Sequence, residues 1–337
     1  MTLISTIDDL SARVDAELSS IVNSRKMPLY RMMSYHMGWR DERGISDIPL
    51  TIQRTHGVLC LLACRAAGGD LDVALPAASA VELVQNFCEI HDDVQGGNPQ
   101  RDNRDAVWWV WGPAQAINTG DGMHALARLA LFRLLDRGVS SVKTFQAVQL
   151  LDEASLQTCE GRFLDIEAQE RIDMSLDAYL KMTESKSGAL VSCAMMLGAL
   201  AATDDERVLD ALGASGAKLG VAMQMRADMR ELWNPMGEDA APSTEVMNKM
   251  KLLPVVYALE NAKLSDKRKI GEIYFKRVLE PDDVVKLRGV IEEMGVRDAC
   301  EKLVTQYHDE VVASLGIPGI SEEGRADIER FADSLLE

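Results

Sequence analysis

The chain has 337 residues, of which 47% are hydrophobic and 26% charged, a composition typical of globular proteins that excludes disordered and fibrous classes. Its 36 basic and 53 acidic residues give a net charge of −17, which argues against nucleic-acid binding as the main role. Aromatic residues make up only 5%, whereas Ala, Leu and Met are abundant, so the composition favours helices over sheets.

The sequence predicts a succession of helices. Ser5 and Asp8 form a capping-box pattern that opens a helix running to about Val22, and turn-forming residues over 41–51 predict a loop. Stretches dense in Ala, Leu and Val at 58–67 and 76–91 predict core helices. Further helical patterns follow at 113–135, 140–169, 175–202, 205–233, 243–262, 265–277, 281–294, 296–314 and 321–336. Because no period-two strand, internal repeat or long linker is evident, we predict one all-α domain over residues 1–337.

Cysteine use and hydropathy predict a cytoplasmic protein without stable membrane insertion. The six cysteines include no Cys-x-x-Cys pair, and most lie in apolar runs, so free buried thiols explain them better than zinc or disulfides. The longest near-apolar run, 190–202, is shorter than the ~20 residues that cross a bilayer. The N-terminus lacks the basic and apolar regions of a signal peptide.

The sharpest chemical feature is a run of acids at the end of the helix predicted at 76–91. Glu89, Asp92 and Asp93 are costly to bury unless a cation neutralises them, and carboxylate oxygens are ligands that Mg²⁺ prefers. An acidic pair at a helix end is more often a solvated surface feature. Taken alone, these residues therefore leave both interpretations open.

Further segments at 100–108, 111–122, 186–190, 219–228 and 249–256 follow in a definite order. Together with the acidic run, they resemble the trans-isoprenyl diphosphate synthase (polyprenyl synthetase) family over nearly the whole chain. That resemblance implies a helical bundle around a central cavity, in which two Asp-rich motifs hold Mg²⁺ on the diphosphate of an allylic substrate. Ionisation leaves an allylic carbocation, which isopentenyl diphosphate then attacks. The resemblance also implies a homodimer.

Four positions at which the family binds isopentenyl diphosphate are altered in this chain. Gln53 and His56 stand where the family has Lys and Arg, and Gln85 stands where it has His. Asp102 replaces the second Arg after the first motif, and an acid opposes a diphosphate at that place. The resemblance therefore implies that the second substrate site is lost.

The residues with which the family binds the allylic diphosphate are present in this chain. The resemblance assigns this role to Arg101, Lys186 and Lys251, with Gln224 in the same site and Lys249 nearby. A cavity that holds one prenyl diphosphate is the expectation that follows.

Both Asp-rich motifs are eroded. Gly96 removes the last carboxylate of the first motif, and Ala227 removes the leading carboxylate of the second. The resemblance still assigns Mg²⁺ binding and catalysis to four residues, namely Asp92, Asp93, Asp228 and Glu231. The alternative is that these acids form ordinary ion pairs, the first two with Arg101 or Arg104 and the last two with Arg226 or Arg230. Arg162, which stands where the family has Gln, could pair with Asp165.

Aromatic residues supply candidate cavity walls, because an aromatic face stabilises a carbocation. Phe87, Trp108 and Phe163 are the candidates in the helices that the resemblance places around the cavity, and core filler is the alternative. Phe87 lies five residues before Asp92, where the family limits prenyl chain length, so we expect a substrate of short or middle length.

Three functions remain open at this point. The first is a Mg²⁺-dependent terpene synthase that ionises one allylic prenyl diphosphate and releases a hydrocarbon or alcohol. The second is a prenyltransferase that uses isopentenyl diphosphate or another acceptor. The third is a non-catalytic partner subunit, suggested by Gly96 and Ala227.

Overall fold

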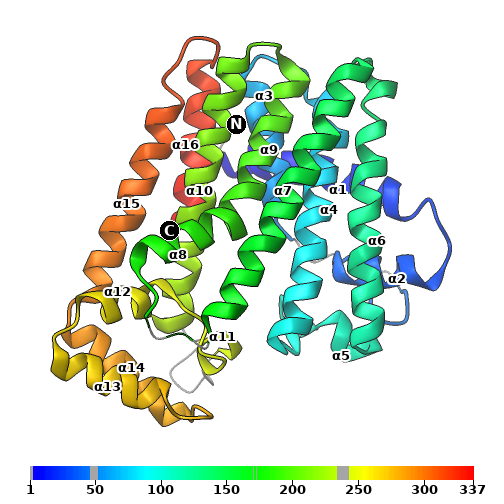
Figure 1. Ribbon diagram of the computed structural model, residues 1–337. Coiled ribbons are helices and arrows are strands. Elements are labelled where there is room, and N and C mark those ends of the chain that lie inside the picture. Colours follow the sequence, from blue (N-terminus) through cyan, green and yellow to red (C-terminus); the bar gives the residue numbers. More distant parts are fainter. Residues whose placement is uncertain (1–2, 46–51, 170, 172, 234–242) are drawn as a thin grey trace. The chain divides into compact units, whose positions relative to one another are not determined.

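The computed structural model describes residues 3–45, 52–169, 171, 173–233 and 243–337, and it confirms the all-α prediction (Figure 1). Contacts divide the chain into two compact units. Unit 1 holds Met1–Ser155, Leu190–Gly216 and Ser314–Phe331, and unit 2 holds Leu156–Ala189, Ala217–Ala313 and Ala332–Glu337. The units are interleaved in sequence, so neither is a separate segment of the chain, and the single domain over 1–337 stays a prediction.

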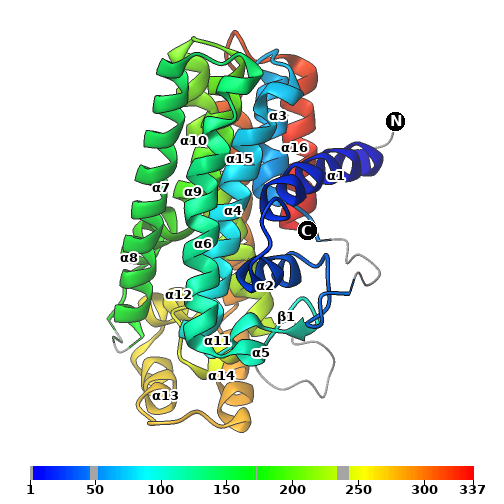
Figure 2. The ribbon, with the colours of Figure 1, turned by 90° about the vertical axis from the view of Figure 1, so that its right-hand side faces the viewer.

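Unit 1 is built around the long helix α4 (Leu71–Gly96), which packs mainly on α3 (Thr55–Ala66) and α6 (Pro113–Phe132) (Figures 1 and 2). Fully buried side chains such as Leu59, Leu62 and Val81 fill these contacts. The unit also contains α1 (Leu3–Val22), α2 (Pro28–His36), α5 (Val107–Trp111), the 3₁₀ turn η1 (Leu135–Arg137), and parts of α7 (Ser141–Ala168), α9 (Ala189–Ala202), α10 (Glu206–Trp233) and α16 (Glu322–Leu336).

Unit 2 contains the remaining parts of α7, α10 and α16 together with shorter helices. These are α8 (Leu176–Thr183), the π turn η2 (Glu184–Gly188), α11 (Thr244–Met247), α12 (Leu253–Asn261), α13 (Leu264–Tyr274), α14 (Pro281–Glu293) and α15 (Val296–Ser314). Of these, α12 packs on α8, and α13 packs on α14.

Several predicted boundaries were wrong. Helix α4 begins at Leu71, before Pro76, because the Asp70 side chain accepts from the Asp72 N–H and caps the helix there. The helix predicted at 243–262 is broken between α11 and α12, where Lys249 has φ +60°. The loop predicted at 41–51 lies partly outside the described residues.

A short β-hairpin was not predicted. Strand β1 (Gln100–Arg101) pairs antiparallel with β2 (Arg104–Asp105) across Asp102 and Asn103, which have φ of 51° and 59°. Two successive residues with positive φ form the turn that matches strand twist, and Asp and Asn tolerate it best after Gly.

The run 176–202, predicted as helical over 175–202, is continuous but contains the π turn η2. By length and composition this run could cross a membrane, yet 61% of its most apolar window is buried inside the fold. A core helix of a globular protein passes the same test, which agrees with the core-helix interpretation. All six cysteines are free, and five of them are buried.

Candidate functional site

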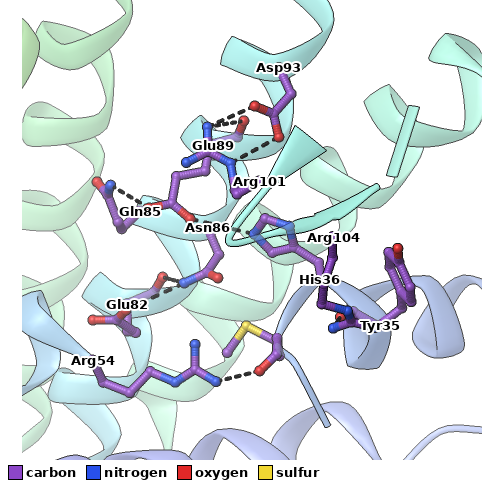
Figure 3. Close-up of polar contacts among 11 residues, drawn as sticks. Tyr35, His36, Arg54, Glu82, Gln85, Asn86, Glu89, Asp93, Arg101 and Arg104 are labelled. Atoms are coloured by element: carbon purple, nitrogen blue, oxygen red, sulfur yellow. Dashed lines mark hydrogen bonds and ion pairs between the residues drawn. The ribbon is translucent and has the colours of Figure 1, made fainter. Parts of the chain in front are cut away.

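In unit 1, the end of α4 and the β-hairpin bring an acid and a cation together (Figure 3). The Asp93 carboxylate is 2% exposed and accepts from Arg101 Nε at 2.9 Å and from Nη2 at 2.8 Å. Burial raises the pKa of Asp93 although the Arg101 charge opposes this, and the surrounding acids raise the pKa of Arg101 further. This two-point ion pair is the alternative that the sequence left open for Asp93.

Glu89 lies one turn before Asp93 on α4 and faces His36, whose Nε2 is 3.6 Å from the Glu89 carboxylate. Gln85 donates to Glu89 at 3.0 Å. Burial disfavours the charged form of Glu89, but the nearby His36 and the Arg101 charge outweigh it and lower the pKa of Glu89 to about 2. Asp92 is half-buried beside this group.

Three of the altered isopentenyl diphosphate positions lie at the start of α3 and in the β-hairpin. Gln53 is exposed, His56 is buried, and Asp102 is exposed at the hairpin tip. Arg54, between the first two, is 2% exposed and holds Asp15 at 2.7 Å while donating to the Met37 carbonyl at 2.6 Å. Arg54, the one cation of this segment, therefore binds groups of the protein itself.

Glu82 on α4 is buried near Arg54 and accepts from the Gly57 N–H at 2.9 Å (Figure 3). Burial raises the pKa of Glu82 to about 7, although the Arg54 charge opposes this. A buried acid with a raised pKa makes stability depend on pH.

We expect the replacement Glu82→Gln to remove part of the pH dependence of stability. The pKa is 4.5 in the unfolded chain and about 7 in the folded one, so the folded state binds the proton more tightly. This contribution is full below pH 4.5 and is lost as the pH rises through 7, about 3 kcal/mol in all. Urea unfolding at pH 5 and pH 8 measures it, with Glu323→Gln at an exposed position as the control. An equal pH response of parent and Glu82→Gln would contradict the assignment.

In unit 2, four of the predicted residues come together in one small pocket. The side chains leave room there for about one water molecule, so a diphosphate can enter only when they move apart. Its predicted members are Lys186, Gln224, Asp228 and Lys251, and the sequence missed its other members Tyr179, Met182, Glu245, Met250 and Leu252. Asp165, singled out only as a partner of Arg162, also lines it. We call this group the unit 2 pocket.

Asp228 on α10 is 3% exposed, and protein donors surround its carboxylate. Tyr179 Oη donates at 2.7 Å, Gln224 Nε2 at 2.7 Å, and the Leu253 N–H at 2.8 Å. Burial raises the pKa of Asp228 to about 6 against the effect of these hydrogen bonds. The alternative pairing with Arg226 does not occur, because Arg226 forms a two-point ion pair with Glu301 at 2.8 Å.

Lys186 lies in the π turn η2 and pairs with Asp165 of α7 at 2.6 Å. Gly161 of α7 and Gly220 of α10 permit this arrangement, because a Cβ on either glycine would overlap the backbone of η2. Asp165 is therefore paired with Lys186, and Arg162 donates weakly, at 3.4 Å, to the Lys186 carbonyl.

Lys251 is 2% exposed and lies at the N-terminal side of α12. Its ammonium donates to the Gln169 carbonyl at 2.9 Å and to the Lys249 carbonyl at 3.1 Å, and it lies 4.9 Å from the Tyr274 ring. Burial and the Lys249 charge lower the pKa of Lys251 to about 8.

Glu231 is half-buried and is not a lining residue of the unit 2 pocket. Glu245 takes a place there instead, and its pKa is raised to about 7 by burial and by repulsion from Glu231. No sequence pattern marked Glu245, because its approach depends on the break between α11 and α12.

The donor set fits Mg²⁺ only in part. Carboxylate oxygens are the right kind of ligand, but in the described ranges no three His, Cys, Asp or Glu side chains gather to hold a metal ion. The two most buried of the four predicted acids, Asp93 and Asp228, are already held by protein donors. The metal role of the four predicted acids stays a prediction.

The three candidate cavity aromatics occupy different environments. Phe87 packs edge-on against His91, with ring centroids 4.6 Å apart, and Trp108 donates to the Asn98 carbonyl at 2.6 Å. Phe163 is 67% exposed on α7. Their role as cavity walls stays a prediction.

The sequence and the fold of this chain are similar to those of known proteins. Residues 52–291 match the family model described as Polyprenyl synthetase. The chain is 31% identical over 300 residues to a geranylgeranyl diphosphate synthase of Mycobacterium tuberculosis, covering 88% of this chain and 84% of that protein. It is 30% identical over 321 residues to a (2E,6E)-farnesyl diphosphate synthase of the same organism, covering 93% and 85%. The structure of a polyprenyl synthetase from Streptomyces coelicolor A3(2) matches with a TM-score of 0.89, 30% identity and full coverage of both chains.

Proposed function

Because the chain belongs to the polyprenyl synthetase family, we propose that it is a prenyltransferase acting on an allylic prenyl diphosphate. The bond between C1 and the diphosphate oxygen breaks, and the diphosphate leaves with the electron pair. The resulting allylic cation is attacked by an electron pair of an acceptor, which then loses a proton. The relatives named as geranylgeranyl and farnesyl diphosphate synthases support a C10 to C20 prenyl chain.

The observation that carries the proposal is the unit 2 pocket. Lys186, Gln224 and Lys251, which stand at the family's diphosphate-binding positions, line one site there together with Asp228. Lys186 and Lys251 carry positive charge that can face a leaving diphosphate as negative charge develops on it. Arg101 is the family's further diphosphate contact, in unit 1. Asp93 holds Nε and Nη2 of Arg101, so Nη1 is the group that can donate to a substrate oxygen while this ion pair persists.

We also propose that Mg²⁺ is required, since the oxygen donors at Asp92, Asp93, Asp228 and Glu231 suit a hard cation. When bound, the ion supplies charge neutralisation of the diphosphate. A homodimer is proposed as well, supported in unit 1 by exposed apolar side chains on α6 and α7, among them Leu129, Phe132 and Phe145.

The second candidate function is the terpene synthase. One observation favours it. Arg54 is bound to Asp15 inside the fold, its neighbours Gln53 and His56 replace the family's cations, and Asp102 lies at the hairpin tip, so a second diphosphate lacks cations to bind it. A chain that cannot hold a second diphosphate could release the cation as a cyclised or quenched product. An acceptor without a diphosphate would satisfy the same observation and keep the prenyltransferase proposal.

The test is to incubate the purified chain with geranyl, farnesyl or geranylgeranyl diphosphate, with and without isopentenyl diphosphate, in MgCl₂ or in EDTA. We expect diphosphate release that requires Mg²⁺, and a longer prenyl diphosphate when isopentenyl diphosphate is present. A terpene hydrocarbon or alcohol from the allylic substrate alone would select the second candidate. No release in any mixture would overturn the terpene synthase and the use of isopentenyl diphosphate, and would favour the non-catalytic partner subunit or a prenyltransferase with an acceptor absent from the mixtures.

A further inference from the structure

A basic and apolar surface lies on α13 and on the loop that follows it, within unit 2. The segment 263–278 holds six basic and two acidic residues, a net charge of +4 in a chain whose total is −17. Helix α13 packs against α14, and the segment between them forms the connecting turn (Figure 1). None of these residues takes part in the proposed function.

Large apolar side chains of this segment face solvent. Leu264 is 67% exposed, Phe275 78% and Val278 66%. Leu264 and Phe275 are eleven positions apart in sequence, which is three helical turns, so they share one face of α13. The Phe275 ring lies over Gly271, where a Cβ would be 3.9 Å from Phe275 Cε2. Single exposed apolar residues are ordinary, but three in one short segment beside a row of cations are not.

The cations beside these side chains are only partly neutralised. Lys269 pairs with Asp266 at 3.1 Å, and Lys276 pairs with Asp283 at 2.5 Å. Lys263, Lys267, Arg268 and Arg277 are exposed, and among the described residues no carboxylate lies within 4.0 Å of them. Four positive charges thus remain in this segment, and of these Lys267 and Arg268 are adjacent in sequence to each other and Arg277 to the apolar Val278.

We propose that this surface docks the protein on an anionic phospholipid bilayer. We call it the α13 patch, and it consists of Leu264, Lys267, Arg268, Phe275, Arg277 and Val278. Its apolar side chains can enter the headgroup region, while the Lys and Arg heads remain at the level of the lipid phosphates. Each basic residue near an anionic leaflet strengthens binding roughly fivefold, so three contribute on the order of a hundredfold.

Charge complementarity favours a bilayer over other occupants. A soluble polyanion would contact the cations but would leave Leu264, Phe275 and Val278 in water. The excess of acids in the rest of the chain is repelled by an anionic surface, so contact through the α13 patch is the favoured orientation. The docking is peripheral, which is compatible with the absence of stable insertion expected from the sequence.

The test is flotation of the full-length chain with vesicles, which does not depend on enzymatic activity. One set of vesicles contains phosphatidylcholine alone, and the other contains phosphatidylcholine and phosphatidylglycerol in equal amounts. We expect binding to the anionic vesicles only, weakening as salt is raised because the charges are solvent-exposed. Equal recovery with both vesicle types, or none with either, would overturn the proposal without any variant.

Two variants separate the parts of the patch. Lys267→Glu with Arg268→Glu should weaken binding to anionic vesicles by at least about thirtyfold, and Phe275→Ala should weaken it several-fold. The controls are Lys181→Glu with Arg207→Glu, and Met27→Ala, at residues that are 73%, 78% and 65% exposed. Circular dichroism melts show whether each variant is folded.

The outcomes are distinct. Loss of vesicle binding in both patch variants, with the controls unchanged, supports the proposal. Equal losses in patch and control variants would show a diffuse charge effect and overturn it. Heparin, a soluble polyanion, distinguishes the remaining case. If Lys267→Glu with Arg268→Glu loses heparin binding while Phe275→Ala binds vesicles like the parent, the α13 patch is a polyanion site and the bilayer proposal fails.

Discussion

Replacement of Lys186 by Met is expected to lower the rate of diphosphate release from an allylic substrate by about 10²- to 10³-fold. Lys186 Nζ is 2.6 Å from Asp165 in the unit 2 pocket, and the side chain is only 17% exposed. A cation held in so restricted a site stabilises developing negative charge more strongly than the same cation in water. The loss should therefore appear in kcat/KM for every prenyl chain length, because the diphosphate is common to all.

The control must separate charge from folding, since Lys186→Met leaves Asp165 buried without its partner. The double variant Lys186→Met with Asp165→Asn removes both charges and should recover the melting temperature without recovering the rate. Lys181→Met, on the exposed face of α8, should match the parent in both measurements. A rate for Lys186→Met within a few-fold of the parent would remove this lysine from the site.

Replacement of Arg54 by Met is expected to destabilise the fold by about 2–3 kcal/mol, because the buried guanidinium is lost while its partner Asp15 is 36% exposed and keeps its hydrogen bond from Trp39. The guanidinium is buried, and its removal leaves Asp15 without its ion-pair partner and the Met37 carbonyl without a donor. It also removes the positive charge that partly offsets the burial of Glu82, whose pKa should rise further. Urea unfolding at pH 7 measures the change in the free energy of unfolding.

Arg13→Ala is the matched control, because Arg13 forms an ion pair of the same 2.7 Å length with Asp72 at the surface. An exposed pair of this kind contributes less than about 1 kcal/mol. If Arg54→Met instead leaves stability unchanged and raises the KM for isopentenyl diphosphate, Arg54 binds substrate, and the loss of the second site is refuted.

Most helices could be predicted, the core helices from their density in Ala, Leu and Val and others from an apolar stripe at helical spacing. Leu10, Val14 and Leu18 of α1 are an example, and all three are fully buried. The π turn η2 has no such local signature. It depends on close approach of Gly161 and Gly220, which are distant in sequence and become neighbours only in the fold. The helix break at Lys249 likewise depends on a positive φ, which a lysine in the sequence does not indicate.

The residues of the candidate site could be predicted where they belong to a family motif. Their interaction partners could not be predicted where these lie far away in the sequence. Arg101 and Asp93 are eight residues apart, so their pairing was among the alternatives that the sequence offered. Tyr179 and Asp228 are 49 residues apart, and a buried tyrosine gives no sign of its partner. The alternative in which Arg226 pairs with Asp228 is not found, because Glu301 of α15 pairs with Arg226 instead.

The π turn at Glu184–Gly188 has a consequence for how this chain can vary. A π turn contains one residue more than the α-helix needs to cover the same rise. Deleting one residue there would let the turn close as ordinary α-helix, with the helices on both sides in register. Deleting a residue from the α-helical part of α8 or α9 would instead rotate every later side chain of the run by about 100° relative to those before it. Natural relatives should therefore tolerate a one-residue deletion in this turn better than one inside α8 or α9.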